Sequence, residues 1–149
     1  MLRTDVKTQF GDLTLTEDRG AIVRMTWGVS GRADRSAVLD AAVEQVRAYD
    51  SGELEVFDLP LDVRGSQFQR DVCAAMSEIP FGQSITYGDI AKRLGAPAQA
   101  VGQACGGNPI PIIIPCHRVM GAKGLTGFSG EGGVETKVAL LRHEGSFLI

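Results

Sequence analysis

The chain has 149 residues, of which 44% are hydrophobic and 22% charged, and its formal net charge at pH 7 is −3. This composition supplies one ordinary hydrophobic core or two small ones, and no apolar run reaches the roughly 18 residues that a membrane-spanning helix needs. Because the N-terminus also lacks the apolar stretch of a signal peptide, we expect a cytoplasmic protein that does not associate with a membrane.

The excess of acidic residues lies in the first part of the chain. Residues 1–65 carry eight Lys and Arg against twelve Asp and Glu, whereas residues 66–149 carry seven against six. Composition alone does not indicate a nucleic-acid partner. If DNA is bound, we expect the second part to bind it, with only modest neutralisation of phosphates.

The cysteines and histidines are few. Cys73, Cys105 and Cys116 are an odd number in a chain without an export signal, so we interpret them as reduced thiols. The two histidines, His117 and His143, form no CxxC or HxxxH spacing. We therefore expect no metal and no cofactor.

Residues 1–65 predict a small sheet with one helix on it. Residues 13–16 and 22–27 alternate in polarity on either side of an Asp-Arg-Gly turn, which indicates a hairpin. Apolar residues between 39 and 49 fall at helical spacing, and Gly52 follows where that helix should end. Residues 54–63 are strand-like, although Pro60 makes them an edge strand or one that ends early.

From Ser66 onward the pattern changes to helices with tight connections. Ser66 and Gln69 have the spacing of a capping box before one helix, and Thr86 and Asp89 offer a second N-terminal cap. A third helix over residues 98–106 follows the short turn Gly95-Ala-Pro97, which is the form of a helix-turn-helix but also occurs in ordinary helix pairs.

The third helix is unusually rich in very small residues. Two glycines inside it, Gly102 and Gly106, cost roughly 1 kcal/mol each relative to alanine. The small residues permit either close packing between helices or close approach of the backbone to a groove of DNA. The pattern leaves both open.

A segment with several prolines and isoleucines follows, residues 108–119, and ends in Cys116 and His117. Pro111 and Pro115 lack a backbone donor, so we expect a buried, extended connection rather than a paired strand. After it come a glycine-rich loop, residues 121–133, and a last helix that begins near Val134.

Cys116 has two interpretations. Most buried cysteines are inert core residues. The alternative is a nucleophile, which requires a lowered thiol pKa, with His117 as the neighbouring base and Glu144 as the residue that orients the histidine.

The sequence Pro-Cys-His-Arg-Val at 115–119 resembles the active-site signature of the O6-alkylguanine-DNA alkyltransferases. The resemblance covers residues 66–145 and includes five further motifs, namely Gly-Asn-Pro-Ile-Pro-Ile-Ile-Ile at 107–114, Tyr87-Gly88, Ala100-Val-Gly102, Gly127-Phe-Ser-Gly130 and His143-Glu-Gly145. It implies an α+β fold, with a ribonuclease-H-like domain at 1–65 and a winged-helix-like, helix-turn-helix domain at 66–149 that binds DNA and carries the active site.

The resemblance also implies roles for individual residues. Cys116 would accept an alkyl group from O6-alkylguanine or O4-alkylthymine in DNA, once and irreversibly, after the base has been flipped out. His117 would act as its base through a water molecule, Glu144 would hold the histidine, and Tyr87 would assist at the guanine. The implied substrate and DNA contacts are Ala98, Gln99, Gly102, Asn108, Arg118, Val119, Phe128, Ser129 and Lys137.

The implied partner is double-stranded DNA carrying alkylated bases, bound through its minor groove by a monomer. Two positions differ from the family: Gln99 stands where an intercalating arginine is usual, and Phe128 where a tyrosine is usual. Both are expected to affect efficiency and lesion preference. The alternatives are a lesion-binding protein without transfer activity, a DNA-binding sensor of alkylation, and a Cys-His hydrolase that turns over.

Overall fold

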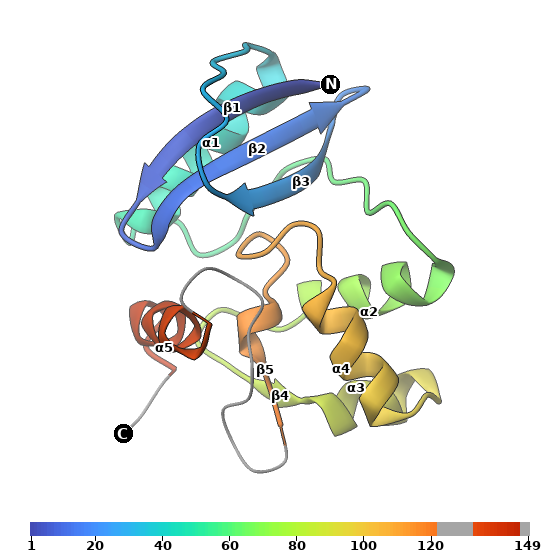
Figure 1. Cartoon of the computed structure of the whole chain (residues 1–149). Coiled ribbons are helices and arrows are strands. Elements are labelled where there is room, and N and C mark those ends of the chain that lie inside the picture. Colours follow the sequence, from blue (N-terminus) through green and yellow to red (C-terminus); the bar gives the residue numbers. More distant parts are fainter. Residues whose placement is uncertain (122–132, 147–149) are drawn as a thin grey trace. The chain divides into compact units, whose positions relative to one another are not determined.

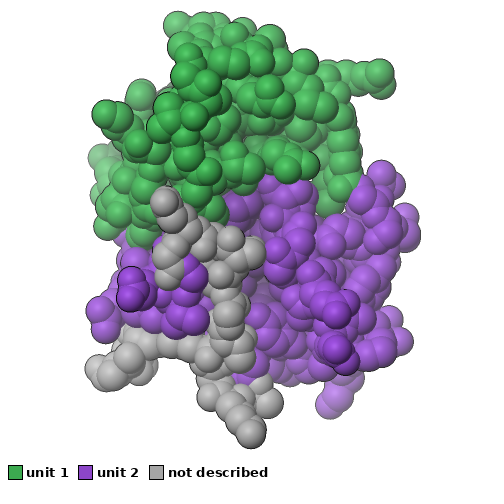
Figure 2. Space-filling model, viewed as in Figure 1, with its two compact units in different colours: residues 1–64 green, residues 65–149 purple. Residues whose placement is uncertain are grey.

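The computed structural model describes residues 1–121 and 133–146 of the chain. The chain forms two compact units, Met1–Arg64 and Gly65–Ile149 (Figure 2). Each unit has its own hydrophobic core.

The first unit is a three-stranded antiparallel sheet with one helix packed on it (Figure 1). The strands are β1 (Leu2–Thr8), β2 (Gly11–Asp18) and β3 (Ala21–Trp27), and the helix is α1 (Ala37–Asp50). The helix begins where the Ser36 hydroxyl accepts a hydrogen bond from the Leu39 amide. Alternating strand residues and the inner face of α1 fill the core with Val6, Leu13, Leu15, Met25, Leu39, Ala42, Val46 and Tyr49.

The predicted hairpin and the helix after it are confirmed. The predicted strand over residues 54–63 is wrong, because this segment meets β3 at a single bridge, Leu61 opposite Ile22. The Ile22 amide donates to the Pro60 carbonyl at 2.8 Å, and the Asp62 amide donates to the Ile22 carbonyl at 2.9 Å. The first strand, β1, was not predicted.

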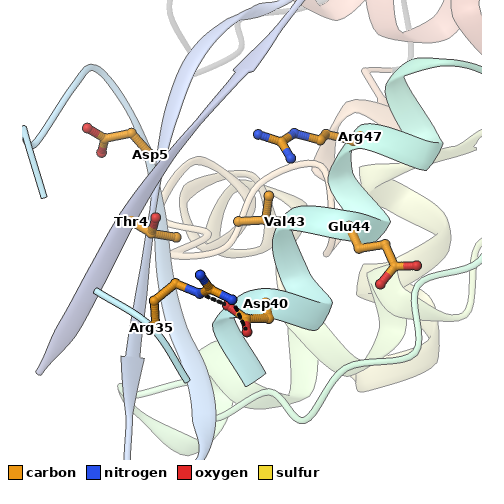
Figure 3. Close-up of a pocket in the computed structure, with 7 residues that line it drawn as sticks. All are labelled: Thr4, Asp5, Arg35, Asp40, Val43, Glu44 and Arg47. Atoms are coloured by element: carbon orange, nitrogen blue, oxygen red, sulfur yellow. Dashed lines mark hydrogen bonds and ion pairs between the residues drawn. The ribbon is translucent and has the colours of Figure 1, made fainter. Parts of the chain in front are cut away.

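The carboxylate of Asp5 on β1 binds the segment after β3 through hydrogen bonds to Ser30 and Gly31. Its carboxylate accepts hydrogen bonds from the Thr14 hydroxyl at 2.8 Å, the Ser30 hydroxyl at 2.6 Å and the Gly31 amide at 2.9 Å. Beside it, a hollow of about 490 Å³ lies between β1 and α1, and Arg35 pairs with Asp40 at its edge (Figure 3).

The second unit consists mainly of helices: α2 (Gln67–Ser77), α3 (Tyr87–Leu94), α4 (Ala98–Gly106), the short 3-10 helix η1 (Cys116–Arg118) and α5 (Val134–His143). Two short strands, β4 (Ile85–Thr86) and β5 (Val119–Met120), pair in parallel. Its core contains Val72, Met76, Ile90, Val101, Ile110, Ile114, Leu140 and Leu141.

The helix boundaries of this unit follow the sequence signals. The Ser66 hydroxyl accepts from the Gln69 amide, and Thr86 and Asp89 form a reciprocal capping box. Gly95 ends α3 in the left-handed conformation at φ 65°, and α4 begins three residues later. The α+β fold class, with an N-terminal sheet and a C-terminal helical part, is confirmed. None of the helices in the described ranges has the length and hydrophobicity needed to cross a bilayer.

Candidate active site

The segment between α4 and η1 is a buried, tightly turned loop held together by Asn108. The Asn108 amide nitrogen donates to the Ile114 carbonyl at 2.8 Å, and its carbonyl oxygen accepts from the Ile110 amide at 3.0 Å. Ile112 adopts φ 71°, which is rare for a β-branched residue. The expectation of an extended connection is therefore wrong, because the chain reverses between Ile110 and Ile114, whose backbones hydrogen-bond at 2.9 Å.

This loop delivers Cys116 to the first position of η1, where its side chain is buried in the second unit. Burial raises the pKa of the Cys116 thiol to about 11, although an Asn108 hydrogen bond and the charge of Lys137 act in the opposite direction. The expectation of a lowered thiol pKa is wrong for this resting state. Desolvation of the thiolate outweighs the two favourable contacts.

His117, Arg118 and Glu144 form a buried hydrogen-bonded cluster. His117 Nε2 lies 2.7 Å from Glu144 Oε2, and the two side chains are completely buried. Arg118 donates to both oxygens of the same carboxylate, from Nε to Oε1 at 2.7 Å and from Nη2 to Oε2 at 3.0 Å. The Glu144 carboxylate, at the C-terminal end of α5, therefore contacts both His117 and Arg118 of η1.

This arrangement favours a neutral His117 with its proton on Nε2. A carboxylate only accepts hydrogen bonds, so Nε2 carries the proton and Nδ1 is the free acceptor of a neutral ring. Burial lowers the pKa of His117, which favours that neutral form although Glu144 opposes it. His117 Nδ1 is buried and lacks a hydrogen-bond partner among the described residues.

Lys137 of α5 is buried near η1. Its Nζ donates to the Val119 carbonyl at 2.6 Å and lies 5.9 Å from the centre of the Tyr87 ring. Burial lowers the pKa of Lys137, while the thiols of Cys116 and Cys105 act against that shift. A buried amine near a buried thiol favours the thiolate form of that thiol.

The remaining predicted residues lie in three different places. Ala98 and Gln99 are exposed on α4 and Gly102 is half-buried there, while a Cβ added to Gly102 or Gly106 would meet no atom within 4 Å. Phe128 and Ser129 lie outside the described residues. Arg118 was predicted as a DNA contact, but it is buried and its third nitrogen donates to the Ile79 carbonyl at 2.7 Å.

Sequence reasoning missed the connection between Arg118 and Glu144. It assigned Glu144 to His117 alone, and nothing in the spacing indicated that the next residue would reach the same carboxylate. The one signal in the sequence was a cation adjacent to the proposed base. In residues 1–121 and 133–146, no three His, Cys, Asp or Glu side chains gather to form a metal site.

Comparison with known proteins identifies the family of the chain. Residues 67–146 match the family model described as 6-O-methylguanine DNA methyltransferase, DNA binding domain. A methylated-DNA–protein-cysteine methyltransferase of Mycolicibacterium paratuberculosis is 50% identical over 118 residues, which cover 77% of this chain and 70% of that protein. The chain belongs to this family.

Other members extend the comparison to the fold. The Mycobacterium tuberculosis methyltransferase of the same name is 54% identical over 108 residues, which are 70% of this chain and 64% of that protein. A crystal structure of the M. tuberculosis O6-methylguanine methyltransferase matches with TM-score 0.85 and 39% identity over 99% of this chain and 94% of that one. A structure of the M. tuberculosis protein in complex with DNA matches with TM-score 0.85 and 41% identity, over 98% and 94%.

Proposed function

We propose that the chain repairs DNA by moving an alkyl group from O6 of guanine to Cys116 Sγ. The observation that carries this proposal is a buried cysteine followed by a buried histidine whose Nδ1 has no hydrogen-bond partner among the described residues. The chain is also 50% identical, over 118 residues, to a named methyltransferase. The thiol proton passes to His117 Nδ1, through a water molecule, as sulfur attacks the alkyl carbon. The carbon–oxygen bond breaks, and the guanine leaves as an anion that takes up a proton.

The reaction occurs once per molecule. The product is a thioether, and no step in the site hydrolyses a carbon–sulfur bond. O4-alkylthymine, which carries its alkyl group on an equivalent oxygen, is a second substrate. Because Cys116 is buried, a base stacked in a duplex cannot reach it and must first be extruded.

We further propose that α3 and α4 bind the minor groove of duplex DNA. The open space over Gly102 and Gly106 supports this role, because close helix packing does not require those glycines. Gln99 is exposed on the same helix and fills the gap left by the extruded base. On this proposal, Tyr87 and Val119 contact the extruded base, and Lys137 favours the thiolate. The predicted roles of Phe128 and Ser129 lie outside the described residues. The protein acts as a cytoplasmic monomer.

Intact-mass analysis after incubation with duplex DNA containing O6-methylguanine tests the proposal. We expect a gain of about 14 Da per molecule, located on the Cys116 peptide, which stops at one equivalent. Cys116→Ser should take up no methyl group, whereas the matched variant Cys73→Ala should react like the parent. Methyl on Cys73 or Cys105, or several lesions repaired per molecule, would contradict the assignment and favour a hydrolase. Lesion binding without transfer would favour a recognition protein.

A further inference from the structure

Every guanidinium nitrogen of Arg118 donates a hydrogen bond to a buried acceptor. Its three guanidinium nitrogens donate to Glu144 Oε1, to Glu144 Oε2 and to the Ile79 carbonyl, and its Cζ lies 5.7 Å from the centre of the Phe81 ring. The two contacts to Glu144 form a bidentate pair, the strongest geometry available to a carboxylate. The Glu144 charge is therefore balanced by Arg118 before His117 contributes.

The pairing of the Arg118 and Glu144 charges determines which charge state of His117 is stable in the interior. With one guanidinium and one carboxylate, the cluster is neutral when the imidazole is neutral. A protonated His117 would add an uncompensated positive charge in a buried site that already faces Lys137, which is costly. Without Arg118, the carboxylate would need another cation, and the adjacent imidazole at 2.7 Å would become that cation.

We propose that Arg118 is a positioning residue for the transfer reaction, because it neutralises Glu144 and so keeps His117 uncharged, with Nδ1 free to accept the proton of Cys116. This inference rests on the proposed function for its catalytic consequence. Among the residues that the structure describes, the charged groups that act on the imidazole are Glu144 and Lys137, from the end and the interior of α5, and Arg118 from η1. The thiol of Cys116 precedes the histidine in η1. A role in DNA contact or in folding alone would not set the charge of the histidine.

The proposal predicts that loss of Arg118 shifts the pH dependence of methyl transfer to higher pH. Burial and the nearby cations lower the pKa of His117, so the base is deprotonated at neutral pH. In Arg118→Gln, the unbalanced carboxylate raises that pKa, and the base becomes protonated at neutral pH. Transfer by this variant should fall by about 10-fold at pH 7 and recover to within about 2-fold of the parent near pH 9, because only neutral imidazole accepts a proton.

Nitrogen NMR of the imidazole rings measures the protonation state of His117 as a function of pH without DNA. With two histidines in the chain, His117→Gln assigns the signals. We expect the parent His117 to be neutral at pH 7 with its proton on Nε2, Arg118→Gln to titrate at higher pH, and Arg118→Lys to lie between them. Lys92→Gln removes an exposed charge from the same unit as the matched control and should leave the titration of His117 unchanged.

Each outcome has one meaning. A parent His117 that is protonated at pH 7, or a titration that does not move in Arg118→Gln, overturns the positioning role. If Arg118→Gln does not fold, the parent spectrum and Arg118→Lys still decide the question. A parent protein that takes no methyl group from O6-methylguanine DNA overturns the proposed function instead, whatever the titration shows.

Discussion

At the scale of single residues, the site combines a thiol that is protonated at rest with a base that is neutral at rest. The pKa of Cys116 is raised to about 11 by burial, and His117 is too deeply buried to carry the charge that would stabilise a thiolate beside it. An ion pair between thiolate and imidazolium is therefore not the resting state. On the proposed mechanism, the thiolate forms when the proton moves to His117.

His117 and Glu144 should therefore affect the chemical step and not DNA binding. Replacing either residue with Gln should slow methyl transfer by about 10²-fold, which is typical when a general base is lost, with little change in affinity for lesion DNA. Single-turnover rates and equilibrium binding to the same duplex measure the two effects separately. Rates equal to those of the parent would show that Cys116 is activated in another way.

The residues of the site were predictable to different degrees. Cys116, His117 and Glu144 follow from the family motif, and the structure brings His117 and Glu144 to 2.7 Å, although their catalytic roles remain predictions. The environment of the thiol was not predictable. The expectation of a lowered pKa considered only neighbours in sequence, whereas the observed direction depends on desolvation by the whole unit. The position of Arg118 was missed for the same reason.

At the scale of elements, α4 provides a test of why the third helix contains so many small residues. In Gly102→Ala and Gly106→Ala, the added Cβ meets no atom, so helix propensity should stabilise the protein by up to about 1 kcal/mol each. Affinity for duplex DNA should fall, since the methyl group lies where the proposed groove approaches. Thermal unfolding and DNA binding measure the two effects.

Gly95→Ala is the matched control, because Gly95 has φ 65° and ends α3. This substitution should destabilise the protein through backbone strain. If Gly102→Ala also destabilised the protein and left DNA affinity unchanged, close helix packing would be the correct explanation.

Helices were predicted better than strands in this chain. Caps at Ser66 and Thr86 and the stop at Gly95 are local signals, and they fix α2 and α3 without reference to the rest of the fold. Strand pairing depends on distant residues. Residues 54–63 have a strand-like composition but touch β3 at one bridge, and β1 becomes a strand because its register with β2 is complete from Leu2 to Thr8.

At the scale of the whole molecule, buried titratable groups limit the pH range over which the fold is stable. The pKa values of Cys105 and Cys116 are raised by burial, from 9.0 to about 12 and about 11. Raised values stabilise the folded chain below pH 9, and this contribution is lost as pH rises through 11 to 12. At the acid end, burial acts to raise the pKa of Asp5, but four hydrogen bonds together lower it from 3.8 to about 2. The contribution of Asp5 to the free energy of unfolding is therefore present above pH 3.8 and is lost as the pH falls to about 2.

Chemical denaturation as a function of pH measures this profile. The free energy of unfolding should decline above pH 9, and Cys105→Ala should make the decline shallower. Asp5→Asn should remove about 1–3 kcal/mol at pH 7, because it replaces a hydrogen-bonded carboxylate with a weaker acceptor, and should flatten the acid limb. Equal alkaline slopes in Cys105→Ala and the parent would show that the thiol of Cys105 is not desolvated.

The uncharged surface of α4 has a further consequence for how DNA binding depends on salt concentration. A helix whose outward residues are mainly alanine, glycine and glutamine releases few counterions when it meets a phosphate backbone, and residues 66–149 carry one more cation than anion. Affinity that arises from close steric fit should therefore vary little with ionic strength. If α4 binds DNA as proposed, we expect slow association, because charge does not steer the approach, and lesion binding that persists at salt concentrations that displace strongly basic DNA-binding proteins.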